Sequence, residues 1–286
     1  MKITKILCSL IIIISVLSAC SISFKKNNDE TSDSSNTIEE STKGEDDSNT
    51  TKEPTNGDVS DSSTKSETPS QNTPTTVDYS KITYSALGDS ITASDGKKPY
   101  STTVKEILGL KNGINNGIGG STVSNRNNGF VDRYDSISIY SDIISIQGGI
   151  NDCRLDVELG TIDSFDETTF MGAYNSLIKK IKEKYPDAFI FLMSMPKTYN
   201  SKTLDMYAYG NGLGYNYLEY ASAIYQIAEK WNLPVLDLYI DSFYEDTELT
   251  DGVHPSQTYI TEILAPMISE FIEANYPKYL EQQKAN

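Results

Sequence analysis

From residue 81 onward, short runs of apolar residues alternate with longer segments whose apolar positions recur every three to four residues. Short apolar runs between turn residues are typical of buried strands, and the longer period is typical of helices that cover a sheet. We expect strands at 82–87, around 114–117, and at 142–147, 188–194 and 234–238. The expected helices cover 100–108, 167–184, 217–231 and 256–274. This alternation predicts an α/β fold with a five-stranded parallel sheet covered on both faces.

The segment 167–184 illustrates how such a helix covers the sheet. Its apolar side chains recur at helical spacing, whereas its lysines fall elsewhere around the helix. The apolar stripe consists of Phe170, Tyr174, Leu177, Ile178 and Ile181. A helix with one such stripe is expected to lie with that side on the sheet.

The first 20 residues have the order of features found in secretory signals. Lys2 and Lys5 precede an apolar run with four consecutive isoleucines, and the segment closes with Leu17-Ser18-Ala19-Cys20. This ending resembles a bacterial lipobox, which implies that Cys20 is lipidated and anchors an exported, extracytoplasmic protein to the cell membrane. An uncleaved apolar anchor and a soluble secreted protein are the alternatives.

Residues 21–80 are dominated by serine, threonine, asparagine, lysine and acidic residues, with no aromatic side chain between Phe24 and Tyr79. Such a stretch cannot bury enough apolar surface to offset its chain entropy, so we expect a disordered linker. A flexible coil of about 60 residues spans on the order of 40–50 Å. The linker contributes much of the net charge of −16, but the remainder is acidic too, which argues against nucleic acid as a partner.

Residues 81–286 are expected to form the folded domain. Of the three cysteines, Cys8 and Cys20 belong to the signal region, which leaves Cys153 without a disulfide partner in the domain. A domain of about 200 residues can be stabilised by its apolar core alone. We assign no role to Cys153, because a lone cysteine usually packs as a small apolar side chain.

The chain contains a single histidine, His254, and Asp251 precedes it by three residues. An imidazole can accept the proton of a serine hydroxyl, and a carboxylate on its other nitrogen orients it. Ser90 directly follows the first expected strand. We therefore predict Ser90 as a nucleophile, His254 as its base and Asp251 as the partner of His254. The alternative for the segment around Asp251 and His254 is a polar turn before a helix.

Two further segments follow expected strands, where ligands bind in open parallel sheets. Gly120 comes after the second strand and Asn151 after the third. Acyl transfer creates an oxyanion, which needs donors held in place. The predicted donors are the N–H groups of Ser90 and Gly120 and the side-chain amide of Asn151. Taken singly, glycines after strands are ordinary turn residues and Asn-Asp pairs cap helices.

Four segments together resemble the signature blocks of the SGNH hydrolases, also called GDSL esterases and lipases. They are Gly88-Asp89-Ser90-Ile91-Thr92, 116–122 with Gly120, Gly149-Ile150-Asn151-Asp152 and Asp251-Gly252-Val253-His254. The blocks occur in order, and the resemblance covers about 200 residues from Lys81 to the C-terminus. It implies a flavodoxin-like three-layer α/β/α sandwich. It also implies Ser90, His254 and Asp251 as catalytic residues and Ser90, Gly120 and Asn151 as the oxyanion hole.

Residues 197–217 are expected to form a polar loop after the fourth strand, near the same edge of the sheet. Its tyrosines include Tyr199, Tyr207, Tyr209 and Tyr215. Tyrosine rings suit the faces of sugars, which makes these four a possible substrate loop. The same side chains also serve to pack long loops, so both interpretations stay open.

These observations favour an exported, membrane-anchored serine esterase that hydrolyses carboxylic esters through an acyl-enzyme. O-acetyl or other short acyl groups on carbohydrate are the favoured substrates, because no long apolar insertion separates the four blocks. A lysophospholipase or short-chain lipase-type esterase, and a non-catalytic carbohydrate-binding lipoprotein, are the alternatives. We expect no cofactor and no metal site, since one histidine and one thiol cannot make the usual nitrogen and sulfur ligand sets.

Overall fold

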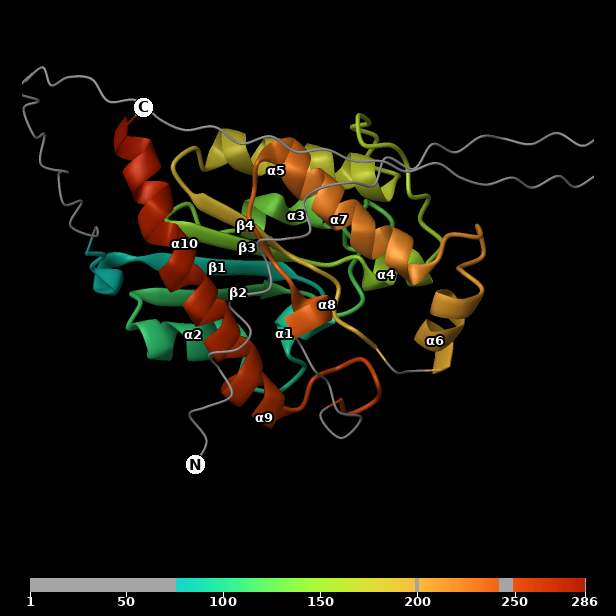
Figure 1. Ribbon diagram of the computed structural model, residues 1–286, viewed down its shortest axis with the longest axis horizontal. Helices are drawn as coiled ribbons and strands as arrows, with labels where there is room; N and C mark the ends of the chain where they lie inside the picture. Colours follow the sequence, from blue (N-terminus) through green and yellow to red (C-terminus); the bar gives the residue numbers. More distant parts are fainter. Residues whose placement is uncertain (1–75, 199–200, 242–248, 286) are drawn as a thin grey trace, which may run out of the picture. The chain divides into compact units, whose positions relative to one another are not determined.

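The computed structural model describes residues 76–198, 201–241 and 249–285, which are drawn in colour in Figure 1. The predicted signal peptide with Cys20, most of the predicted linker, and Tyr199 lie outside the described residues. Within these three ranges, no helix combines the length and the apolar character needed to cross a bilayer. The export signal and the linker therefore stay predictions.

Five parallel strands form one sheet in the order β2-β1-β3-β4-β5. The strands are β1 Thr83–Gly88, β2 Asn112–Gly117, β3 Ile143–Gln147, β4 Phe189–Met193 and β5 Val235–Leu236. In this order β2 lies outside β1 and the remaining strands follow on the other side, as in flavodoxin-like folds. The predicted five-stranded parallel sheet is confirmed.

Helices cover both faces of this sheet (Figure 1). One face carries α2 (Tyr100–Leu108) and α10 (Ala265–Ala285), and the other carries α3 (Phe130–Arg133), α5 (Phe170–Lys184) and α7 (Tyr217–Trp231). The shorter helices are α1 Ser90–Ala93, α4 Ile150–Arg154, α6 Ser201–Ala208, α8 Leu238–Asp241 and α9 Gln257–Tyr259, with single turns at Tyr79–Lys81, Tyr134–Ser136 and Ile260–Leu264. The predicted three-layer sandwich is confirmed.

Burial explains the nearly continuous apolar sequences of the central strands. Every residue of β1, β3 and β4 is buried, because helices shield both of their faces. The predicted stripe of α5 lies in this core, with Phe170, Tyr174 and Leu177 fully enclosed. The helix begins three residues later than predicted, at Phe170, because Thr169 caps it by accepting a hydrogen bond from the Gly172 N–H.

The predicted end of the last helix, at residue 274, is wrong. α10 continues to Ala285 through Pro277. The rings of Tyr276 and Tyr279 lie 5.9 and 5.4 Å from the ring of Phe189. These aromatic contacts stabilise the final turns and outweigh the one backbone hydrogen bond that a proline removes.

The predicted end of the fifth strand, at residue 238, is also wrong, because β5 stops at Leu236. The Leu238 N–H donates to Ser194 Oγ at 2.8 Å, and the Tyr239 N–H donates to Asp237 Oδ1 at 2.8 Å. These side-chain acceptors satisfy the first N–H groups of α8. The chain therefore turns into a helix before the apolar run has ended.

Two glycines allow α1 to lie directly against the ends of β1 and β2. A Cβ on Gly117 would come within 2.1 Å of the Ala93 backbone nitrogen, and one on Gly88 within 1.9 Å of Thr92 Oγ1. Gly117→Ala is therefore expected to displace α1 and to lower the free energy of unfolding by about 1–3 kcal/mol. Urea unfolding measures this loss.

Gly109→Ala is the matched control for this substitution. A Cβ on Gly109 meets no atom within 4 Å, so only its φ of +66° opposes the change. We expect the control to lose about 1 kcal/mol or less. Equal losses for the two variants would contradict the packing of α1 against Gly117.

Candidate active site

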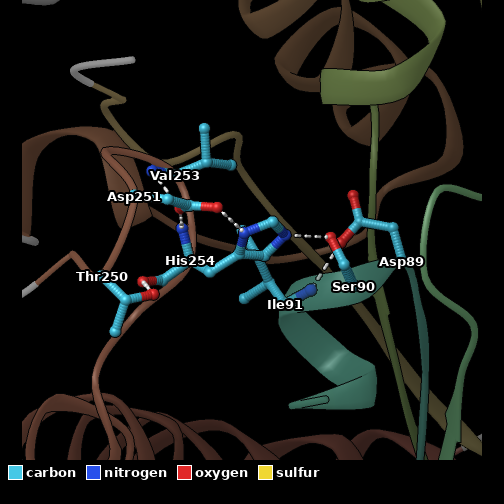
Figure 2. Close-up of polar contacts among 7 residues, drawn as sticks. All are labelled: Asp89, Ser90, Ile91, Thr250, Asp251, Val253 and His254. Atoms are coloured by element: carbon cyan, nitrogen blue, oxygen red, sulfur yellow. Dashed lines mark hydrogen bonds and ion pairs between the residues drawn. The ribbon is translucent and has the colours of Figure 1, made fainter.

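Ser90 lies at the carboxyl end of β1 and is the first residue of α1 (Figure 2). Asp89 caps this short helix, since its Oδ1 accepts a hydrogen bond from the Ile91 N–H at 3.0 Å. The chain leaves the strand at Gly88 and turns at once into the helix. The Ser90 hydroxyl is therefore presented at the edge of the sheet, where β1 gives way to α1.

The single histidine of the chain reaches Ser90 from a distant segment. His254 Nε2 lies 2.8 Å from Ser90 Oγ, and His254 Nδ1 lies 2.7 Å from Asp251 Oδ2 (Figure 2). Ser90 and His254 are 164 residues apart in the sequence. The structure thus brings together the three side chains that the sequence predicts as nucleophile, base and orienting carboxylate.

A tight turn holds Asp251 and His254 in this arrangement. The Thr250 N–H donates to the His254 carbonyl at 2.9 Å. Asp251 Oδ1 accepts hydrogen bonds from the N–H groups of Val253 and His254 at 3.0 and 2.9 Å. Partial burial acts to raise the pKa of Asp251, but these N–H groups and the His254 ring outweigh it and hold that pKa below its ordinary value. Asp251 is therefore ionised at neutral pH.

Ser90 and His254 open into a cleft of about 380 Å³, whose lining includes the predicted oxyanion donors Gly120 and Asn151. A larger cleft of about 610 Å³ lies against the start of β4 and is lined by aromatic, lysine and amide side chains. Neither Ser90 nor His254 lines that second cleft. The smaller cleft is the candidate active site, because it alone of these two contains a hydroxyl hydrogen-bonded to an imidazole.

Gly120 and Asn151, the predicted oxyanion donors, both line the cleft that contains Ser90. Gly120 follows β2 with a φ of +72°, a conformation that favours glycine. Asn151 lies in α4, where its Nδ2 donates to the Ser121 carbonyl at 3.0 Å and its Oδ1 accepts from Arg154 Nη2 at 3.0 Å. Because a guanidinium only donates, Arg154 determines which side of the Asn151 amide carries the NH₂ group. The Ser121 carbonyl accepts one hydrogen bond from that group, and the group makes no second one to the described residues.

Asp152 holds the loop that follows Gly120 against α4. Its carboxylate accepts hydrogen bonds from the N–H groups of Val123 and Ser124 at 2.8 and 3.0 Å. Sequence reasoning treats Asp152 only as part of a motif or a helix cap and gives it no role of its own. Its place directly after Asn151 is the signal that could have identified it.

Arg133 joins three segments beneath the cleft, and sequence reasoning misses it entirely. Its guanidinium donates to the carbonyls of Asn116 and Gly88 at 2.6 and 2.7 Å and to the Ser121 hydroxyl at 3.1 Å. These groups lie at the ends of β2 and β1 and in the loop after Gly120. No motif around Arg133 indicates this role, because the three groups that it joins lie 12 to 45 residues away in the sequence.

Burial of Asp89 makes the stability of the fold depend on pH. Desolvation raises the pKa of Asp89 to about 7, despite its hydrogen bond from the Ile91 N–H and the charges of His254 and Arg133. A raised carboxyl pKa means that the folded state holds this proton more tightly than the unfolded state. Its contribution to stability is therefore present at low pH and is lost as the pH rises through about 7.

We expect the free energy of unfolding to fall by about 2 kcal/mol between pH 5 and pH 7.5 because of Asp89 alone. Asp152, whose pKa burial raises to about 6, adds to the decrease in the same direction. Urea unfolding at both pH values measures the change. Asp89→Asn is expected to reduce it, whereas the exposed control Asp132→Asn is expected to leave it unchanged. A wild-type protein that is more stable at pH 7.5 would contradict this prediction.

The predicted polar loop 197–217 contains a helix, α6, which is a correction to the sequence analysis. The apolar side of α6 reaches the core, where Met206 is buried and its sulfur lies 3.6 Å from Cys153 Sγ. One buried methionine is too weak a signal to predict a helix in a segment that is otherwise polar. Cys153 packs in the core, and burial raises its pKa to about 12.

The described tyrosines of this segment do not reach Ser90. Tyr207 packs on Tyr217 with ring centroids 4.5 Å apart, and Tyr215 meets Tyr220 edge-on at 6.4 Å. Tyr209 is 83% exposed. Among the described residues, none of these side chains lines the cleft of Ser90. Tyr207 and Tyr215 therefore pack the segment against α7. No contact between the described tyrosines and the cleft supports a substrate loop, and Tyr199 lies outside the described residues.

Comparison with known proteins agrees with this fold. Residues 86–258 match the GDSL-like Lipase/Acylhydrolase family. A protein of known structure from Lactobacillus plantarum is 28% identical, with a TM-score of 0.62 over 68% of this chain and 98% of its own. A structure described as a possible lipase from Chitinophaga pinensis is 23% identical, with a TM-score of 0.54 over 68% of this chain and 98% of its own. Among curated proteins no match was found.

The family match extends from inside β1 to α9 and so includes Ser90, Gly120, Asn151, Asp251 and His254. It covers more than half of the chain, and the likeness in fold extends over nearly the whole of both similar structures. The sheet order and the flanking helices are those that the resemblance implies. The chain therefore belongs to the GDSL-like lipase/acylhydrolase family, the SGNH hydrolases, and is a carboxylic ester hydrolase.

Proposed function

We propose that Ser90, His254 and Asp251 are the catalytic triad of this esterase. His254 Nε2 accepts the hydroxyl proton as Ser90 Oγ attacks the carbonyl carbon of the ester. The tetrahedral intermediate then collapses, the alcohol leaves with the proton from His254, and an acyl group remains on Ser90. In the second half, His254 removes a proton from water as the water oxygen attacks the acyl carbon. The bond from that carbon to Ser90 Oγ then breaks, the carboxylic acid leaves, and Ser90 recovers its proton from His254.

One observation carries this proposal: a continuous line of hydrogen bonds runs from Asp251 through His254 to Ser90, at 2.7 and 2.8 Å. A base within this distance can remove the serine proton as the bond to carbon forms. Asp251 holds the proton on Nδ1, so that Nε2 is the nitrogen that accepts. The ionised carboxylate also stabilises the imidazolium that results.

The negative charge on the carbonyl oxygen requires donors, and we assign the N–H groups of Ser90 and Gly120 and the amide of Asn151. Gly120 and Asn151 both line the cleft that contains Ser90. Arg154 and Ser121 hold the Asn151 amide in one orientation before substrate binds. Donors fixed in advance stabilise the transition state without a reorganisation cost during reaction.

The cleft favours short acyl groups on a polar alcohol. Among the described residues that line it, only Ile150 and Val253 carry aliphatic side chains. A methylene group gains about 0.8 kcal/mol only where it is buried against apolar surface, so a long acyl chain gains little here. We therefore propose O-acetyl or similar short acyl esters of carbohydrate as substrates. A lysophospholipase would need an apolar surface for its long chain and is the less supported alternative.

The proposal is tested with nitrophenyl esters from acetyl to dodecanoyl and with a fluorophosphonate. We expect the highest kcat/KM for the acetyl or propionyl ester and a phosphonate adduct on the peptide that contains Ser90. A maximum at decanoyl or dodecanoyl would favour the lysophospholipase alternative. No turnover of any ester and no adduct would leave a non-catalytic binding lipoprotein as the better explanation.

We also propose that the protein is exported, lipidated at Cys20 and held at the cell surface by the linker 21–80. The order of charged, apolar and small residues before Cys20 supports this proposal. Cys20→Ser is expected to abolish incorporation of radiolabelled palmitate and to remove the protein from the membrane fraction. Undiminished labelling of that variant would contradict lipidation at Cys20.

A further inference from the structure

The cleft contains a carboxylate that the proposed mechanism does not use. Asp95 lines the same cleft as Ser90 and His254. Both of its carboxylate oxygens face Gly119, since a Cβ built there would lie 3.6 and 4.0 Å from them and 4.0 Å from the Ser90 Cβ. Asp95 thus lies close enough to the Ser90 hydroxyl for one small substrate to contact both. It makes no hydrogen bond or ion pair with any described residue.

The turn that carries Asp95 is held in place at both ends. On one side the Ser94 N–H donates to the Ser90 carbonyl at 2.9 Å, at the end of α1. On the other, the Lys98 N–H donates to Gln257 Oε1 at 2.7 Å, which fastens the turn to α9. Asp95 itself has a φ of +31°, in the left-handed region that few side chains adopt. The carboxylate is therefore presented to the cleft by anchored backbone.

The charges around the cleft favour some ligands over others. Among the described residues that line the cleft, the carboxyl groups are those of Asp95, Asp251 and the buried Asp89, and Arg154 carries a permanent positive charge. Arg154 already donates to Asn151 Oδ1 at 3.0 Å. Asp251 faces His254, so Asp95 is the exposed carboxylate that remains for a ligand. An anionic alcohol would meet like charge here, whereas hydroxyl groups would meet an acceptor.

We infer that Asp95 is a specificity-determining residue that accepts hydrogen bonds from hydroxyl groups on the alcohol half of the ester. The inference rests on the proposed function, in which the acyl group is short. An acetyl group has no hydrogen-bond donor, so the donors that suit Asp95 belong to the alcohol. The site thus selects uncharged, hydroxyl-bearing alcohols over simple alkyl alcohols and over alcohols that carry a carboxylate or phosphate.

Three substrates that share an acetyl group test this directly: glyceryl monoacetate, ethyl acetate and acetoxyacetate. We expect kcat/KM of the wild-type protein to be about 10- to 100-fold higher for glyceryl monoacetate than for ethyl acetate, since a hydrogen bond to a charged group has that effect. Acetoxyacetate, with its carboxylate, is expected to be the poorest substrate. Most of the difference should lie in KM, because Asp95 binds the alcohol and does not touch the reacting bond.

Asp95→Asn is the informative variant, because asparagine matches the shape of aspartate and tolerates the left-handed backbone. Its Oδ1 still accepts a hydrogen bond but carries no charge, so we expect it to lose part of the preference for glyceryl monoacetate and to gain activity on acetoxyacetate, while ethyl acetate is hydrolysed within about twofold of wild type. Asp187→Asn, which removes the same charge from an exposed position before β4, is expected to change none of these ratios. Asp95→Gly, which removes the acceptor and tolerates the left-handed backbone, is expected to lose most of the preference for glyceryl monoacetate.

The outcomes separate this inference from the proposed function. If Asp95→Asn lowers all three rates equally, or leaves their ratios unchanged, Asp95 does not select the alcohol. The esterase mechanism would still stand in that case, provided that the wild type is active and Ser90→Ala is inactive. If the wild type hydrolyses none of the three acetates and no nitrophenyl ester, the proposed function fails and this inference fails with it.

Discussion

Ser90→Ala is expected to lower kcat for nitrophenyl acetate by about 10⁴- to 10⁶-fold, the largest effect of any single substitution in this protein. The hydroxyl oxygen that the variant lacks is the one that lies 2.8 Å from His254 Nε2. Without it, no acyl-enzyme forms, and the oxyanion donors can only assist a direct attack by water. Steady-state hydrolysis and the loss of the fluorophosphonate adduct measure the effect.

The loss should not arise from unfolding. Ser90 Oγ contacts the His254 ring and contributes nothing to the cap of α1, which Asp89 provides. The thermal midpoint of Ser90→Ala is therefore expected to match wild type within a degree or two. The exposed Ser136→Ala serves as a control with full activity. Retention of more than a hundredth of the wild-type kcat by folded Ser90→Ala would overturn Ser90 as the nucleophile.

Asp251→Asn is expected to lower kcat/KM by about 10²- to 10⁴-fold, the second largest effect. Asp251 Oδ1 accepts the N–H groups of Val253 and His254, and an asparagine oxygen can do the same, so the turn keeps its shape. The NH₂ group then replaces Oδ2 beside His254 Nδ1 and can only donate. It stabilises the tautomer with a proton on Nε2, which cannot accept the serine proton.

The comparison with Asp251→Ala separates the tautomer effect from the structure of the turn. The alanine variant loses both the Nδ1 partner and the acceptor of two backbone N–H groups, so it is expected to be less stable than Asp251→Asn and at least as inactive. Hydrolysis of nitrophenyl acetate and thermal unfolding of both variants provide the test. Activity of Asp251→Asn within tenfold of wild type would show that Asp251 does not control the tautomer of His254.

Several elements follow from local sequence pattern alone. The helices predicted at 100–108 and 217–231 have those bounds in the structure. They were predictable because apolar spacing and end signals agree: Gly109 follows the first in the left-handed conformation, and Asn216 caps the second in a capping box. The start of α5 and the ends of β5 and α10 were less predictable, since side chains distant in sequence or local acceptors decide them.

The sequence by itself determined the order of strands and helices, hence the layered fold, and the chemistry at the ends of the strands. The order of elements follows from the spacing of apolar residues, which is a local property of the sequence. The base could be predicted because the chain contains a single histidine. Only the tertiary structure decided the distance between Ser90 and His254 and the hydrogen bonds by which Asp152 and Arg133 join separate segments. It also decided that Tyr207 and Tyr215 do not line the cleft and that Asp95 does. The contacts of Ser90, Asp152, Arg133 and Asp95 join segments far apart in the chain, and no local pattern of residues encodes which of them meet.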